Sequence, residues 1–161
     1  MAATAVASDQ IQKEESGRFN PISGGHDRPA QYKMIDVDQG AAAGDDGSTL
    51  RLAIFPPGKI TLLLAEARLA HSAFGTSRVM KIGHTAYTEP DGDAVAADDD
   101  DLDSNVDVSS AGSFAPTGTI GGAETKTFET KDGFEIFATV TGGTIPAAAT
   151  VNGYIPFIKH Q

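Results

Sequence analysis

Residues 132–158 constrain the fold more than any other part of this chain. Apolar side chains recur at every second position from Phe134 to Val140, which is the period of a strand with one buried face. Two glycines and a proline within residues 142–146 end this run. The same alternation resumes over residues 151–157. This stretch therefore predicts two packed strands and carries no group suited to chemistry.

Weaker signals of the same kind occur along the rest of the chain. Further strands are predicted at residues 32–37, 50–55, 60–69, 78–87 and 125–129, and another is predicted to start at residues 106–108. A short helical turn is predicted at residues 95–102. The Pro-Pro-Gly at residues 56–58 and the Asp-Gly at residues 132–133 each predict a hairpin. Pro156 predicts that the last strand is an edge strand, because proline lacks a ladder donor.

These segments indicate a β fold. About eight short strands with turn signals roughly every 8–12 residues are the expectation for a sandwich or a jelly roll. The 18 glycines and 8 prolines agree with a turn-rich β protein. We predict an all-β fold, a jelly roll or β-sandwich over residues 31–161, preceded by an extended N-terminal arm over residues 1–30.

The first 30 residues show no sustained hydrophobic period, which is typical of a disordered tail. They nevertheless contain Ile11, Phe19 and Ile22, apolar side chains that a purely solvating tail would not need. A tail and an arm that becomes ordered on a neighbour both fit these observations. On the second interpretation, Ile11, Phe19, Ile22 and Tyr32 contact a partner.

Charge and composition exclude several classes of function. The formal net charge is -10, so the chain is repelled by nucleic-acid phosphates and we expect no nucleic-acid partner. No apolar run approaches the roughly 20 residues of a membrane span, and we expect neither a membrane partner nor a secretory signal. Cysteine is absent, which excludes disulfides and thiolate metal sites.

A run of four consecutive aspartates is the most charged segment, and hard cations such as Ca²⁺ bind clustered carboxylates. An EF-hand pattern that starts at Asp99 fits at Asp101 and Asp103. It then fails, because Ser104 stands where glycine is required and Ser110 where glutamate is required. We expect a solvated acidic loop with no specific metal site, in which Asp99, Asp101 and Asp103 are the candidates for weak cation binding.

No pattern of catalytic residues is present. The four histidines lack the spacing of a zinc motif, and His71 and His84 are expected to be hydrogen-bonded structural residues in or beside strands. The glycine clusters match neither a dinucleotide-binding nor a phosphate-binding loop, and no nucleophile elbow occurs. We predict that the chain is not an enzyme and uses no cofactor.

The order of these segments resembles the small virion proteins of tailed bacteriophages known as head decoration, cement or capsid-stabilising proteins. The pieces that carry the resemblance are PPGK (residues 56–59), SAFGTSRVMKIGHTAY (72–87), the DG…AVAAD loop (91–98), LDSNVDVSS (102–110) and FATVTGGTIPAAAT (137–150). The resemblance extends from about residue 50 onward and leaves out the arm.

The resemblance implies a β-sandwich or jelly roll bound to the outside of an icosahedral head, where it stabilises capsomer contacts. The implied partner is the major capsid protein, and the protein itself is expected to form a homo-oligomer, a trimer or dimer. It implies a location on the outer surface of the head after synthesis in the host cytoplasm.

Three other functions remain as alternatives. A tail- or neck-associated β adaptor has the same sequence requirements. A small trimeric β enzyme, such as a nucleotide hydrolase, suits the length, but Arg51, Arg68 and Arg78 are scattered and form no phosphate-binding motif. A carbohydrate-binding jelly roll usually stacks sugars on exposed aromatic rings, and this chain has no tryptophan and three tyrosines.

Overall fold

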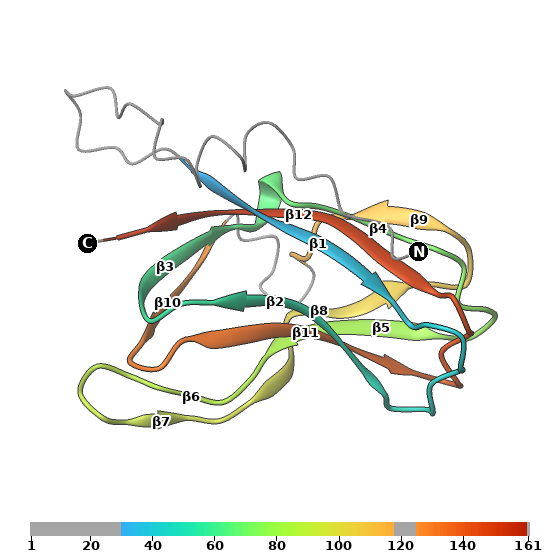
Figure 1. Ribbon diagram of the computed structural model, residues 1–161, viewed down its shortest axis with the longest axis horizontal. Coiled ribbons are helices and arrows are strands. Elements are labelled where there is room, and N and C mark those ends of the chain that lie inside the picture. Colours follow the sequence, from blue (N-terminus) through green and yellow to red (C-terminus); the bar gives the residue numbers. More distant parts are fainter. Residues whose placement is uncertain (1–29, 118–124, 161) are drawn as a thin grey trace, which may run out of the picture.

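The computed structural model describes residues 30–117 and 125–160. In these two ranges the regular secondary structure is almost entirely strand, and two antiparallel sheets face each other as a β-sandwich (Figure 1). The prediction of an all-β jelly roll or β-sandwich is confirmed. The predicted arm, with Ile11, Phe19 and Ile22, lies outside the described residues. Within the described ranges no helix has both the length and the apolar character needed to cross a bilayer.

The described chain contains twelve strands and one short 3-10 helix. The first half of the chain holds β1 (Gln31–Asp38), β2 (Thr49–Phe55), β3 (Gly58–Leu63), the 3-10 helix η1 (Leu64–Glu66), β4 (Arg68–His71), β5 (Val79–His84) and β6 (Tyr87–Thr88). The second half holds β7 (Ala94–Val95), β8 (Asp98–Asp107), β9 (Gly112–Phe114), β10 (Thr125–Thr130), β11 (Phe134–Thr141) and β12 (Thr150–Lys159).

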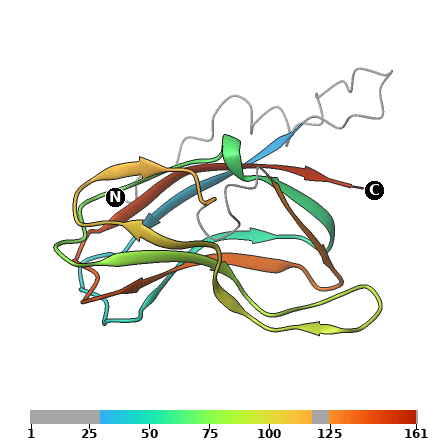
Figure 2. The ribbon, with the colours of Figure 1, turned by 180° about the vertical axis from the view of Figure 1, so that it is seen from behind.

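The strands form two main sheets and one hairpin. The six-stranded sheet contains β12 with β1 on one side and β3 and β4 on the other, and β10 and β9 pair with β3 and β4 in turn. The four-stranded sheet has the order β2-β11-β5-β8. The β6–β7 hairpin projects beyond the sandwich (Figure 1). Figure 2 views the molecule from the side of β8 and β9, opposite to β1 and β2.

Pairing in this fold is nested. Starting at the β6–β7 hairpin in the middle of the chain and moving outward along the sequence, the strands pair in the following order: β6 with β7, β5 with β8, β4 with β9, β3 with β10, β2 with β11 and β1 with β12. All these pairs are antiparallel, so the described chain is one long double strand that passes back and forth between the two sheets. When this double strand wraps around the core, β12 also pairs with β3 and β4, and β11 also pairs with β5. A double strand wound around one core is a jelly roll.

Both predicted hairpin turns are crossings between the sheets. The chain passes from β2 in one sheet to β3 in the other at Pro56, and it returns from β10 to β11 at Gly133. The two crossings lie against each other, since a Cβ added at Gly133, where φ is +86°, would lie 2.5 Å from the carbonyl oxygen of Phe55. The hairpin predictions are wrong, because a tight turn has the same local sequence whether it closes a hairpin or joins facing sheets.

Aromatic rings from both sheets fill the core beside these crossings. The ring of Phe134 stacks on Phe128, with centroids 4.2 Å apart, and on Phe55, with centroids 5.0 Å apart. Phe157 meets Phe55 edge to face at 5.3 Å. The predicted inward positions of the segment that begins at Phe134 are confirmed: Phe134, Ile136, Ala138 and Val140 are all buried.

Strand β2 contains a β-bulge that changes which side chains face the core. Two consecutive residues of β11 pair with Ala53 and Arg51, so Leu52 between them is an extra residue. Beyond the bulge the alternation changes phase, and Phe55 is buried while Ile54 is 57% exposed. Simple alternation that continues from Leu52 would place Ile54 on the buried face, whereas the bulge turns it outward.

Strand β12 is central, so the prediction that Pro156 marks an edge is wrong. One side of β12 pairs with β1 along its length. On the other side, pairing with β4 ends at Tyr154 and pairing with β3 begins at Phe157. Pro156 lies in the interval between them, where the neighbouring chain forms η1 instead of a strand. The missing ladder donor is tolerated there because the ladder is already interrupted.

The predicted strand at residues 60–69 is divided by η1 into β3 and β4. The predicted helical turn at residues 95–102 is wrong, because this segment forms β7 and the start of β8. Helix-favouring side chains in that segment are outweighed by pairing with neighbouring strands.

Replacing Ile136, which is fully buried, with threonine should lower the free energy of unfolding by about 2–4 kcal/mol, since it removes apolar volume and buries a hydroxyl. Urea denaturation measures this loss. The same substitution at Ile54, which is 57% exposed, should change stability by about 0.5 kcal/mol or less. Equal losses at the two positions would contradict the inward and outward assignment.

Candidate functional site

An apolar cluster lies on the outer face of the six-stranded sheet, at its β1 edge. Tyr32 is 51% exposed and Met34 is 56% exposed, and both belong to β1. The ring of Tyr32 meets Tyr154 of β12 edge to face, with centroids 5.5 Å apart. Met34 stands directly opposite Tyr154 in the register of the two strands. We call Tyr32, Met34 and Tyr154 the β1 cluster.

Alternation along β1 turns these side chains outward. Ile35 is buried and Val37 packs against the core, so Tyr32 and Met34, which occupy the alternate positions, face away from it. Among the described residues β1 pairs only with β12, so its second edge presents backbone N–H and C=O groups to the outside. An open edge beside exposed aromatic side chains can accept an additional strand or an apolar surface of a partner.

The four aspartates that follow Ala97 lie at the start of β8, so the prediction of an acidic loop is wrong. Ile82 and His84 of β5 are two residues apart, whereas their partners on β8, Asp103 and Asp98, are five residues apart. This wide bulge passes over Gly83, where an added Cβ would lie 1.9 Å from the carbonyl oxygen of Asp98. Glycine at this position allows the two backbones to approach so closely.

The bulge sends neighbouring carboxylates in different directions. Asp99 and Asp100 each lie 3.3 Å from Nζ of Lys81. Asp101 instead accepts a hydrogen bond from Nζ of Lys126 at 2.7 Å, and its other oxygen lies 3.6 Å from Nε2 of His84. Because Lys126 belongs to β10, this ion pair joins the two sheets.

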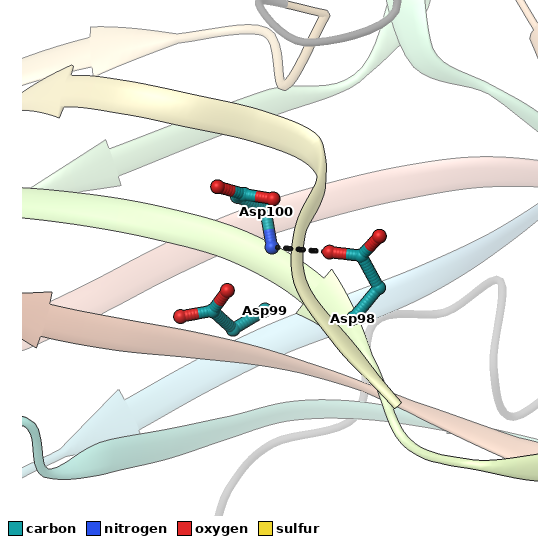
Figure 3. A group of neighbouring side chains, drawn as sticks. All are labelled: Asp98, Asp99 and Asp100. Atoms are coloured by element: carbon teal, nitrogen blue, oxygen red, sulfur yellow. Dashed lines mark hydrogen bonds between the residues drawn. The ribbon is translucent and has the colours of Figure 1, made fainter. Parts of the chain in front are cut away.

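The predicted trio of Asp99, Asp101 and Asp103 does not gather at one point. The backbone N–H of Asn105 donates to Asp103, which is buried. The carboxylates that do converge belong to Asp98, Asp99 and Asp100, whose oxygens lie within 4.8 Å of one another (Figure 3).

That group already has a cation beside it. Hydrogen bonds to Asp100 and then Asp99 raise the pKa of the Lys81 ammonium above its ordinary value. Lys81 therefore places one positive charge beside two of the three carboxylates, Asp99 and Asp100.

Many aspartates in this chain shape turns. In five places among the described residues a carboxylate oxygen accepts the backbone N–H two residues further on, which is the Asx-turn geometry. These aspartates are Asp38, Asp91, Asp98, Asp103 and Asp107. At Asp107 the hydrogen bonds from Ser109 lower the pKa of the carboxyl group below its ordinary value. Turn formation therefore accounts for part of the acidity that suggested a cation site.

The two strand histidines are hydrogen-bonded, as predicted. His71 and His84 are buried, and Nδ1 of each donates to the carbonyl oxygen of the next residue, Ser72 or Thr85. A carbonyl only accepts hydrogen bonds, which fixes the proton on Nδ1.

Sequence reasoning selected Tyr32 and missed its two neighbours in the β1 cluster. The alternation of Met34 with Ile35 could have placed Met34 on the outer face. Tyr154 could not have been joined to Tyr32, because the pairing of β1 with β12 connects residues that are far apart in the sequence.

Neither protein-family models nor curated proteins match this chain. Two chains of solved structures are similar to it, one in the structure of infectious bursal disease virus Gx strain and one in that of the Gt strain. The first has a TM-score of 0.46 and 11% identity over 83% of this chain, and the second a TM-score of 0.44 and 11% identity over 88%. This chain spans 33% and 35% of their respective lengths. Both come from a virus, but similarity at this level carries no argument about function.

Replacing Lys81 with methionine should lower the urea midpoint at neutral pH, because Asp99 and Asp100 lose their shared cation. The loss should shrink in about 1 M salt, where the screening length is only about 3 Å. Because the pKa of Lys81 is raised, its contribution is fully present at neutral pH and is lost only as the pH rises through the folded-state pKa.

The control is Lys131→Met, which removes the same charge from an exposed turn. If Lys81→Met and Lys131→Met lower the urea midpoint equally at both salt concentrations, the stabilising role of Lys81 is contradicted.

Proposed function

We propose that this chain is a virion structural protein that binds the outer surface of a tailed-phage head and stabilises contacts between capsomers. The β1 cluster carries this proposal. Exposed aromatic and thioether side chains gather on an open edge strand, and they follow directly after the segment predicted to be a partner-binding arm. Aromatic side chains and methionine are enriched at protein interfaces.

The β body suits such a role. Nested pairing fixes the edge strand β1 to β12, which is held in turn by β3 and β4. A protein that binds only the assembled shell stabilises the assembled state relative to its separate subunits, by thermodynamic linkage. Many copies bound together make a modest affinity effective. The partner in this proposal is the major capsid protein, and the protein acts as a homo-oligomer on the outside of the head.

The net charge of -10 supports an outward, solvated face. The acidic start of β8 lies in the four-stranded sheet, on the strand furthest from β2 within that sheet. A protein that binds through the β1 cluster can keep these carboxylates in water.

Tyr32→Ser combined with Met34→Ser should weaken binding to capsids that lack this protein by about tenfold or more, because it removes the aromatic and thioether contacts. Co-sedimentation with such capsids measures the affinity. The control is Ile54→Ser, an equally exposed apolar side chain on the other sheet, which should bind as the wild type does. Failure of the wild-type protein to bind at any ionic strength would overturn the proposed function.

Deleting residues 1–30 should leave the body folded, because the nested strand pairs of the described chain begin at Gln31. Capsid binding should fall if the arm contacts the shell. Circular dichroism and urea denaturation follow folding, and co-sedimentation follows binding. Equal binding by the truncated and full-length proteins would contradict the arm.

The number of copies in the virion separates head from tail. Hundreds of copies per particle, counted by quantitative mass spectrometry, are expected for a head protein. A few copies per particle would favour a tail or neck adaptor instead.

A further inference from the structure

Arg78 is held in an unusual setting just before β5. Four other cations of the described chain pair with carboxylates, namely Arg51, Lys59, Lys81 and Lys126. The guanidinium of Arg78 has no carboxylate partner among the described residues. Its polar contact is a long hydrogen bond of 3.4 Å from Nη2 to Oγ1 of Thr144, at the exposed surface.

Two glycines form a slot around this guanidinium. A Cβ added at Gly75 would lie 1.9 Å from Nη1 of Arg78, and one added at Gly143 would lie 3.2 Å from Nε. These glycines belong to different connections, β4 to β5 and β11 to β12, at the same end of the sandwich. Any larger side chain at Gly75 would displace the guanidinium, so the slot depends on its glycines.

The slot removes water from one side of the charge. Nε of Arg78 is buried and has no hydrogen-bond partner in residues 30–117 or 125–160. Leaving a buried donor without an acceptor costs free energy, and a partly desolvated charge interacts more strongly with an opposite charge. One outer nitrogen, Nη2, reaches Thr144 at the exposed surface, while Nε is enclosed.

This geometry fits a carboxylate. A guanidinium binds a planar two-oxygen group through two parallel N–H bonds. A phosphate carries more charge and usually meets several donors, whereas within residues 30–117 and 125–160 the side-chain hydrogen bond of Arg78 is to the hydroxyl of Thr144. The carboxylate of Asp46, which accepts from the N–H of Gly143 at 3.4 Å, and the net charge of -10 would both repel a doubly charged anion more strongly.

We propose that Arg78, in its glycine slot, binds a carboxylate side chain of the capsid protein. The identity of this partner rests on the proposed function, and the carboxylate site itself does not. Arg78 lies at the end of the sandwich where β4 passes into β5, so it supplies a charged contact separate from the β1 cluster.

The site is tested on the isolated protein with acetate as the probe. The Nε–H of Arg78 is shielded from water, so its NMR signal should be observable and should shift saturably with acetate. The signal of Arg51, which already pairs with Glu135, should not shift. An equal response to sodium chloride would overturn the site. A response that appears only in Asp46→Asn would also overturn it, because the chain's own carboxylate would then occupy Arg78.

The partner is tested by co-sedimentation of Arg78→Gln with capsids that lack this protein. Binding should weaken by about tenfold or more, as for loss of one member of a partly desolvated ion pair. Arg78→Lys should also weaken binding, because an ammonium keeps the charge and loses the planar fork. The matched control, Arg51→Gln, should bind within about twofold of the wild type. Urea midpoints identify any variant that fails to fold, and the acetate titration needs no variant.

The two proposals fail differently. If the wild type does not bind capsids, the proposed function is wrong and the acetate titration still decides the site. If the wild type binds and Arg78→Gln binds equally well, the assignment of Arg78 to the capsid contact is wrong. A change in the oligomeric state of Arg78→Gln without capsids would assign the carboxylate to a second copy of this chain and would overturn the capsid partner.

Discussion

Every sheet in this protein depends on pairing between strands that mirror each other about the β6–β7 tip. A strand near the start of the chain cannot satisfy its backbone groups with its neighbour in sequence, because that neighbour usually lies in the other sheet. It finds its partner in the second half instead. This constraint turns both tight turns, at Pro56 and Gly133, into adjacent crossings, and it gathers Phe55, Phe128 and Phe134 into one stack.

Local pattern predicted the strands well where one face is buried throughout. The alternation from Phe134 to Val140 and the buried positions of β12 follow directly from the sequence. Connectivity did not, since nothing local distinguishes a hairpin turn from a crossing between sheets. The exposed position of Ile54 and the central position of Pro156 were also missed. Each depends on an irregularity in a neighbouring strand pair that residue types alone do not reveal.

The candidate sites show the same division. Tyr32 was selected from its own segment, but Tyr154 joins it only through the β1–β12 pair. The aspartates suggested a flexible cation loop, and the fold instead divides them between Lys81, Lys126 and backbone N–H groups. In the sequence Arg78 is one of several scattered arginines that form no motif. Its slot is built by glycines from separate connections, so only the folded chain shows it.

The mirrored order also has a consequence for how the molecule is made. Residues 150–159 of β12 occupy the middle of the larger sheet, between β1 on one side and β3 and β4 on the other. During synthesis these earlier strands leave the ribosome long before their shared neighbour exists, and their apolar faces stay uncovered for that interval. Folding must then close contacts across almost the whole described length, which is slow and leaves nascent chains open to aggregation. We therefore expect chaperones to meet this protein before its last strand is in place.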